Sequence, residues 1–131
     1  MKFSFEYTVD TANKLLICEV RGEVKQILDL EHLLKTTVKM AGKNQVKNVV
    51  VDITEFIIHC PNIELAKLLV NTQEQGWLTD MKIAHIIRSE RNTHNVIAGL
   101  ADKFELPIKN FETRSEAMLW LLFDKIRSDN V

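Results

Sequence analysis

The sequence predicts one α/β domain with a mixed, mostly parallel sheet, and three observations carry this prediction. Residues 46–53 include the consecutive valines Val49, Val50 and Val51, which is typical of a parallel strand covered by helices on both faces. Two further apolar runs, 82–88 and 108–111, alternate with segments of helical periodicity. Residues 2–21 contain two strand patterns so close together that only an antiparallel hairpin joins them.

The first strand is predicted over residues 2–9, where polar and apolar residues alternate strictly. A period of two indicates an edge strand with one buried face and one solvent-exposed face. A turn over residues 10–14 follows, and the next strand is predicted over residues 15–21, where Gly22 ends it.

Two helices flank the valine-rich strand. From about residue 25 to 41, apolar side chains recur at spacings of three and four, which predicts an amphipathic helix that Gly42 terminates. After the strand, Pro61 suits the first turn of a second helix, because its missing N–H would be unpaired there anyway. That helix is expected to end near residues 75–76.

The last part of the chain repeats the alternation. The strand 82–88 is followed by residues 89–92, which open a helix that Pro107 closes. A short strand at 108–111 leads to Thr113, and Glu116 three residues later completes a capping-box pattern for a helix to about residue 126. The predicted order is ββαβαβαβα, with an antiparallel N-terminal edge strand, in a single domain spanning residues 1–131.

Composition excludes several classes of protein. The 17 basic and 18 acidic residues leave a net charge of -1, which argues against a nucleic-acid binder that neutralises phosphates. Cys18 and Cys60 form no zinc-binding spacing, and neither a metal nor a cofactor is predicted. We find no signal peptide and no stretch long enough to span a bilayer, so a cytoplasmic protein is expected.

The functional site is predicted at the carboxyl end of the valine-rich strand, because ligands bind at this end of parallel sheets. Asp52 is expected to end the strand, and a loop is expected to follow it. The apolar triplet 56–58 in this loop either forms the mouth of a pocket or folds onto the core where the second helix begins. The expected binding residues are Asp52, Thr54, Phe56, Ile57, Ile58, His59, Cys60, Arg88 and Arg91.

Arg88 and Arg91 follow the strand 82–88 and are expected at the same sheet end as Asp52. Two arginines beside a helix start suit an anion, since the free N–H groups there favour negative charge. The alternative is a solvated loop in which Ser89 or Asn92 caps the helix.

Cys60 and His59 form the most reactive-looking pair, because a helix N-terminus and an imidazolium would both lower the thiol pKa. A small hydrolase or transferase that uses Cys60, His59 and Asp52 is therefore the alternative function. Adjacent residues seldom face each other, so a structural cysteine and a surface histidine are the other interpretation. His85 is expected to be a core histidine, and with His59 and His94 it gives no metal-binding spacing.

The predicted last helix has an apolar run, 117–123, that is wider than the stripe needed to cover a sheet. Its surplus face predicts a homodimer, because contiguous apolar patches usually mark contacts. The alternative is that Leu119 or Phe123 packs against the N-terminal hairpin or a neighbouring helix.

Three segments resemble the SpoIIAA-like, STAS-type proteins of bacteria, also described as STAS/SEC14-like. The strand 49–53 with its closing Asp52 is similar to the central strand of anti-sigma-factor antagonists, and residues 81–87 are similar to the next strand. The segment 108–121, with Phe111, Glu116 and Trp120, is similar to the closing element of the group. The resemblance covers nearly the whole chain and implies the fold.

In phospho-switched members of the wider family, the resemblance implies an Asp-Ser pair at the start of the second helix. Residues 59–61 offer no hydroxyl at that place, and Thr54 lies too early. The expected function is therefore a non-enzymatic regulatory or binding domain without the phosphorylation switch. Its expected partner is a protein or an apolar small molecule, and the SEC14-like side of the resemblance implies a lipid.

Overall fold

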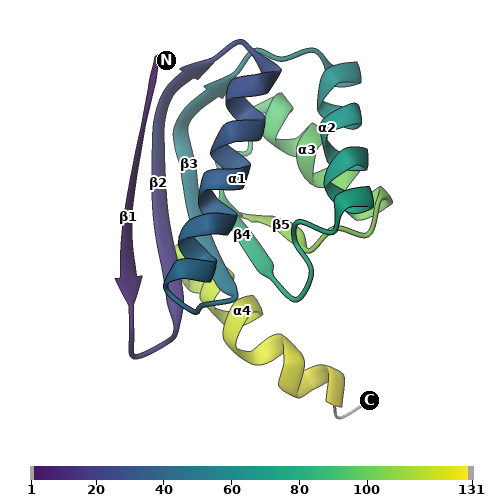
Figure 1. The fold of residues 1–131 in the computed structure, drawn as a ribbon. Helices are drawn as coiled ribbons and strands as arrows, with labels where there is room; N and C mark the ends of the chain where they lie inside the picture. Colours follow the sequence, from purple (N-terminus) through teal and green to yellow (C-terminus); the bar gives the residue numbers. More distant parts are fainter. Residues whose placement is uncertain (1, 130–131) are drawn as a thin grey trace.

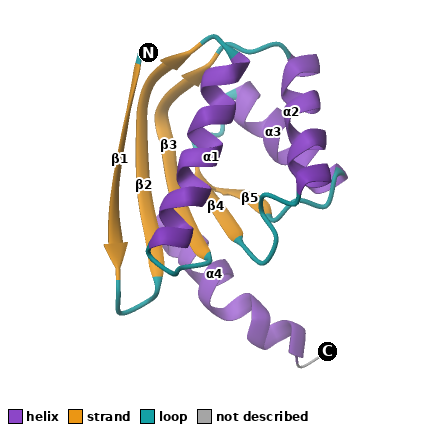
Figure 2. Ribbon diagram, in the orientation of Figure 1, coloured by secondary structure: helices purple, strands orange, loops and turns teal. Residues whose placement is uncertain are grey.

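The structure, a computed structural model, describes the backbone of residues 2–129 and the side chains of residues 2–123. The predicted order ββαβαβαβα is confirmed (Figures 1 and 2). No helix in the described range is long and apolar enough to cross a membrane. The elements are β1 (Phe3–Asp10), β2 (Leu15–Val24), α1 (Ile27–Lys43), β3 (Asn48–Ile58), α2 (Asn62–Gln75), β4 (Lys82–Ile86), α3 (Asn92–Lys103), β5 (Ile108–Phe111) and α4 (Arg114–Asp129).

The five strands lie in the sheet in the same order as in the sequence. β1 pairs antiparallel with β2, and the other neighbours pair in parallel. Each parallel crossover joins adjacent strands, and such crossovers are almost always right-handed, so α1, α2 and α3 all lie on one face of the sheet. Figure 1 shows this layer in front of the strands and α4 behind them.

Each face of the sheet has its own apolar core. The larger core lies under α1, α2 and α3, and includes Val49, Val51 and Ile83. The smaller core lies under α4, where Val50 and Trp120 are buried. Because side chains of a strand alternate between faces, consecutive valines are needed to fill both cores at once.

The valine-rich strand is longer than predicted, and this overturns the expected position of Asp52. β3 continues to Ile58, so Asp52 lies within the strand and the apolar triplet 56–58 is strand rather than loop. The extension is possible because β2 also continues, to Val24, and pairs with it up to Ile58. The register shifts between Glu19 and Arg21, which keeps apolar residues on the core face beyond that irregularity.

Gly22 does not end its strand as predicted. It lies within β2 at a φ of 111°, where a Cβ would collide with the Lys2 carbonyl oxygen. The first helix likewise continues past Gly42 to Lys43. The Thr113 half of the predicted capping box is present, because the Glu116 N–H donates to Thr113 Oγ1 at 3.2 Å, and the Glu116 carboxylate accepts a hydrogen bond from the Thr113 hydroxyl at 2.9 Å.

Candidate functional site

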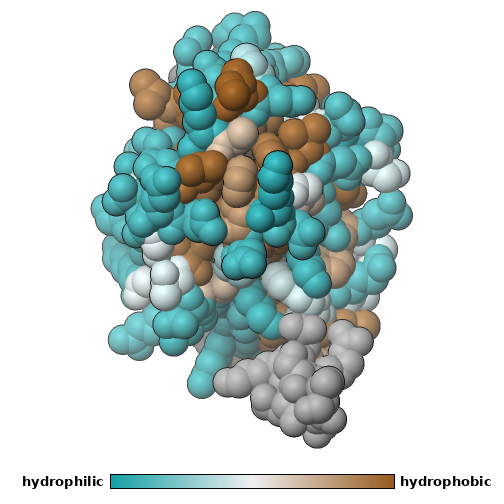
Figure 3. Space-filling view, turned by 90° about the vertical axis from the view of Figure 1, so that its right-hand side faces the viewer, coloured by the Kyte–Doolittle hydropathy of each residue, from teal (hydrophilic) through white to brown (hydrophobic). Residues whose placement is uncertain are grey.

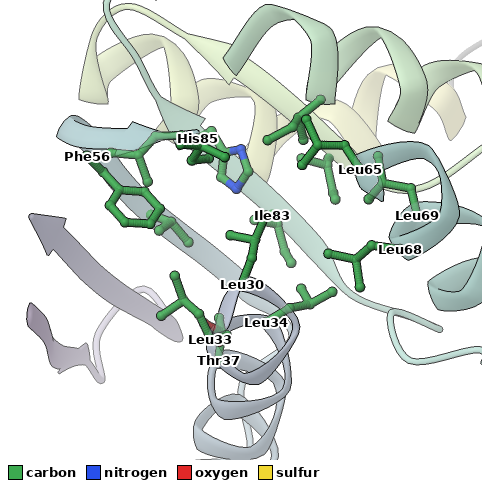
Figure 4. Close-up of a pocket in the computed structure, with 15 residues that line it drawn as sticks. Leu30, Leu33, Leu34, Thr37, Phe56, Leu65, Leu68, Leu69, Ile83 and His85 are labelled. Atoms are coloured by element: carbon green, nitrogen blue, oxygen red, sulfur yellow. The ribbon is translucent and has the colours of Figure 1, made fainter. Parts of the chain in front are cut away.

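An apolar pocket of about 80 Å³ lies between the sheet and the helices of its larger core. Figure 4 shows side chains of α1, α2, β3 and β4 converging on it. The pocket is lined by Leu30, Leu33, Leu34 and Thr37 of α1, Val51, Ile53, Phe56 and Ile58 of β3, Leu65, Leu68 and Leu69 of α2, Ile83 and His85 of β4, Ile97 of α3, and Ile108 of β5. Concave apolar pockets with few polar groups are the usual small-molecule sites of proteins.

The helical repeat of α1 explains which of its residues line the pocket. Spacings of three and four bring Leu30, Leu34 and Thr37 to the face that meets the sheet. The Thr37 hydroxyl donates to the Leu33 carbonyl oxygen at 2.9 Å, so its hydrogen is already used inside the helix. Thr37 therefore offers the pocket an oxygen lone pair and no donor.

His85 is the other polar group of the lining, and it projects from β4 into the pocket (Figure 4). Its Nδ1 is buried without a hydrogen-bond partner. Burial, and to a smaller extent the neighbouring His94, lowers the pKa of His85 to about 4. The imidazole is therefore neutral at pH 7, and no Asp, Glu, Lys or Arg side chain is among the pocket residues in the described part of the chain.

A buried polar corner, which we define as His85, His94 and Asn110, lies beside the pocket. Asn110 is the cross-strand partner of His85, and its Nδ2 donates to the His94 carbonyl oxygen at 3.0 Å. His94 Nε2 lies 2.9 Å from the Phe56 carbonyl oxygen, so this nitrogen carries the hydrogen and donates it. The remaining polar atoms, His94 Nδ1 and Asn110 Oδ1, are buried without partners.

The predicted site residues separate into two groups. Phe56 and Ile58 line the pocket, as buried residues of β3. Asp52, Thr54 and Ile57 do not line it. Asp52 lies in register with Ile86, which belongs to the core under α4, and therefore projects to the opposite face of the sheet.

Asp52 and Thr54 interact with each other rather than with the pocket. The Asp52 carboxylate accepts hydrogen bonds from the Thr54 N–H at 3.0 Å and from its hydroxyl at 2.7 Å. This arrangement stabilises the strand where its register shifts, and it leaves the hydroxyl hydrogen of Thr54 occupied.

Cys60 and His59 do not form an activated pair. Cys60 is buried, and its thiol pKa is raised by burial and then by the carboxylates of Glu64 and Asp29. His59 is exposed, and its Nε2 lies 3.5 Å from Glu23 Oε1. No hydrogen bond connects Cys60 to a histidine in the part of the chain with described side chains. A raised thiol pKa lowers the thiolate fraction, the opposite of what a nucleophile needs.

The two arginines have different surroundings. Arg88 forms an ion pair with Glu55 at 2.5 Å on the surface. Arg91 is the N-cap residue of α3 without a side-chain cap hydrogen bond, and its Nε is buried without a partner. The expectation that Ser89 or Asn92 caps the helix is wrong, because the N-cap residue is Arg91 and no side chain caps the helix.

Among the described residues, no group of three or more His, Cys, Asp and Glu side chains could hold a metal ion. On α4, Ala117, Trp120 and Leu121 are buried against the sheet, whereas Leu119 is 58% and Phe123 is 51% exposed. The alternative in which Leu119 or Phe123 packs against the hairpin or another helix is therefore wrong.

No protein-family model matches the sequence, and no curated protein matches it. Several solved structures are similar in fold, and two of them superpose with a TM-score above 0.5 as follows. An anti-sigma factor antagonist from Mycobacterium paratuberculosis superposes with a TM-score of 0.56 at 16% identity, over 90% of this chain and 94% of that one. An uncharacterized protein with a SpoIIAA-like fold from Shewanella loihica gives a TM-score of 0.56 at 17% identity, over 92% and 94%. The chain therefore has the SpoIIAA-like, STAS-type fold that its residues predicted.

Proposed function

We propose that this domain is a non-enzymatic regulatory module that binds a small, uncharged, apolar molecule between α1, α2 and the sheet. The observation that carries the proposal is the apolar pocket with a single neutral imidazole in its wall. A well-packed core has few voids larger than a water molecule. A pocket of about 80 Å³ among leucines and isoleucines is larger than such packing leaves, and a bound ligand would account for it.

The pocket volume limits the size of the ligand. A dry cavity of roughly 150 Å³ accommodates benzene. At about 80 Å³, the pocket suits a short aliphatic group rather than the long acyl chain of a lipid. Of the two expected kinds of small molecule, we therefore propose the small apolar one.

We infer that the ligand enters from solvent along α1 and α2. A shallower groove of about 320 Å³ on the outer side of α1 and α2 shares Leu68 with the pocket, and Glu31 and Lys67 are among its residues. Figure 3 shows apolar side chains reaching the surface among hydrophilic ones on the side of the molecule that carries α2. Rotation of the Leu68 side chain would connect the groove to the pocket.

A protein partner is the second part of the proposal. One similar structure is, by name, an antagonist of an anti-sigma factor, which supports a regulatory role through protein contacts. The hydrolase or transferase alternative finds no comparable support, because burial and two carboxylates raise the pKa of Cys60.

Filling the pocket is expected to abolish small-molecule binding. Leu34→Phe adds volume at the half-buried wall of α1, so we expect the affinity for 1-butanol to fall at least tenfold. Methyl-resolved NMR titration of the leucine and isoleucine residues of the pocket measures this change. The matched control is His32→Phe on the same helix, at an exposed residue that lines neither the pocket nor the groove, and it is expected to leave binding unchanged. Absence of any butanol-induced shift in the wild-type protein would contradict the proposed function.

The exposed apolar residues of α4 support a homodimer, which stays a prediction. Leu119→Glu places a charge on this face and is expected to convert a dimer into a monomer at micromolar concentration. Light scattering coupled to gel filtration measures the mass. Ile63→Glu, at a residue that is 64% exposed on α2, is the control and leaves the mass unchanged. A wild-type mass equal to one chain contradicts the prediction.

A further inference from the structure

We propose that the protein partner docks as an extended segment along the open edge of β1, with apolar side chains on the helix-covered face of the sheet and a lysine or arginine opposite Glu6. This inference rests on the second part of the proposed function, a contact with a protein, and adds the surface and the chemistry of that contact. It does not depend on a ligand in the pocket.

The outer edge of β1 is open for main-chain pairing. β1 is the first strand in the sheet order, and within the described residues only β2 pairs with it (Figure 1). The Glu23 N–H donates to the Lys2 carbonyl oxygen at 3.1 Å, and this pair continues the register of β1 and β2. Hydrogen-bonded pairs alternate along an antiparallel ladder, so every second residue from Lys2 onward bonds to β2. The backbone N–H and C=O groups of the intervening residues therefore point to the open edge, and these residues are Phe3, Phe5, Tyr7 and Val9.

β1 lacks the features that usually protect an edge strand. Natural edges are blocked by lysine, by proline, by a β-bulge or by being short. Residues 3–10 contain neither lysine nor proline, and all eight pair with β2 without a register shift. Such an edge accepts a further strand through main-chain hydrogen bonds, which is a recurring way in which domains bind peptides. Antiparallel pairing is slightly more stable per residue, so we expect an antiparallel partner.

The helix-covered face of β1 presents an apolar surface at this edge. Phe3, Phe5 and Val9 pack against the larger core, whereas Tyr7 is 45% exposed. The ring centroids of Phe5 and Tyr7 lie 6.2 Å apart. Residues directly opposite each other on one face of an antiparallel pair have Cβ atoms about 4.5–5.5 Å apart, so a partner strand would reach both rings. Apolar side chains on this face of the partner would remove the Tyr7 ring from water.

The opposite face of β1 favours a basic partner. Glu6 lies directly opposite Glu19 of β2, and like charges in this arrangement are unfavourable. Arg21 forms an ion pair with Glu19, and the Asp10 carboxylate accepts hydrogen bonds from Asn13. Glu6 is exposed and forms no ion pair with a described side chain. A lysine or arginine opposite Glu6 would supply the missing counter-charge.

The charges of β1 argue against a second copy of this chain at the same edge. The two charged residues of β1, Glu6 and Asp10, are both acidic. Two β1 strands side by side would bring carboxylates together without a cation from either strand. A partner of opposite charge is therefore the expected occupant.

A hexapeptide blocked at both ends tests the docking mode. In the sequence Thr-Val-Lys-Val-Thr-Val, valine occupies one face of the extended peptide, and threonine or lysine occupies the other. By 1H–15N NMR titration, we expect peptide-induced shifts at Phe5, Tyr7 and Val9. The same peptide with N-methylated valines is expected not to bind, because residues opposite Phe5 and Tyr7 exchange N–H bonds with them in an antiparallel pair.

Reversing the charge of Glu6 tests the counter-charge. Glu6→Lys is expected to weaken binding of the lysine peptide about fivefold and to strengthen binding of the peptide in which glutamate replaces lysine. The substitution places a cation opposite Glu19, so the fold is expected to be retained. Glu74→Lys, at an exposed residue of α2, changes the net charge equally and is expected to leave both affinities unchanged.

The inference is overturned if the peptide does not bind, if its N-methylated form binds equally well, or if Glu6→Lys leaves the peptide preference unchanged. Shifts of Phe5 and Tyr7 that depend on protein concentration without any peptide would also overturn it, because they indicate a second copy at the edge. Failure of the pocket proposal is seen separately, as the absence of butanol-induced shifts in the wild-type protein.

Discussion

Replacing Phe56 by alanine is expected to lower the free energy of unfolding by about 3–5 kcal/mol, the cost of deleting a buried aromatic ring. Phe56 is 1% exposed, and its ring packs edge to face on that of Phe3 at 5.7 Å between centroids. The substitution removes the contact between β3 and β1 and enlarges the neighbouring pocket. Urea unfolding followed by circular dichroism measures the loss.

The same experiment tests whether Phe56 belongs to the core. If residues 56–58 formed the solvent-facing mouth of a pocket, one of the two arrangements that the sequence left open, truncation of Phe56 would cost little. The control is Ile63→Ala, at an exposed residue of α2, which is expected to change stability by no more than about 0.5 kcal/mol. A loss for Phe56→Ala as small as that of the control contradicts the burial of Phe56 in the core.

Acidification is expected to destabilise the protein through His85. Its pKa is lowered from 6.5 to about 4 in the folded state, chiefly by burial. Below pH 6.5 the unfolded chain binds a proton that the folded protein excludes, so the contribution of neutral His85 is fully present above pH 6.5 and is lost as the pH falls toward 4. A shift of this size corresponds to about 3 kcal/mol. The pKa of His94 is lowered as well, and this adds to the loss in the same direction.

Unfolding free energies at pH 7, 6 and 5 measure the effect, with wild type and His85→Leu compared at each pH. The difference between the two proteins isolates His85 from the carboxylates that titrate in both. The variant is expected to lose less stability on acidification than the wild type. Parallel pH profiles for wild type and His85→Leu contradict the assignment.

The element order was predictable because its signals are local. Each signal depends on the faces that a single element buries. β1 alternates because one of its faces is covered, β3 has consecutive valines because both faces are covered, and α1 repeats apolar residues at helical spacing. Crossover handedness then places α1, α2 and α3 together without further information. The cap at Thr113 could also be predicted from the sequence, because Thr113 and Glu116 lie within one helical turn of each other.

The end of β3 was not predictable from the same signals. Thr54 and Glu55 interrupt the apolar run, so the pattern resembles a strand that stops near Asp52. In the structure, the shifted register restores Phe56 and Ile58 to the core face, and β2 supplies the backbone partners. Pairing with a distant segment decided this boundary.

The sequence by itself determined the fold class, the hairpin, the helices and the absence of an obvious catalytic motif, because each depends on residues close together in the chain. Only the tertiary structure decided where the site lies. The pocket takes its wall from six elements, and the pKa of His85 is lowered by burial among them and, to a smaller extent, by His94 of α3. A buried histidine in an apolar strand is unremarkable in sequence. Its missing charge at pH 7 arises from desolvation and from a neighbour that only the folded protein brings close.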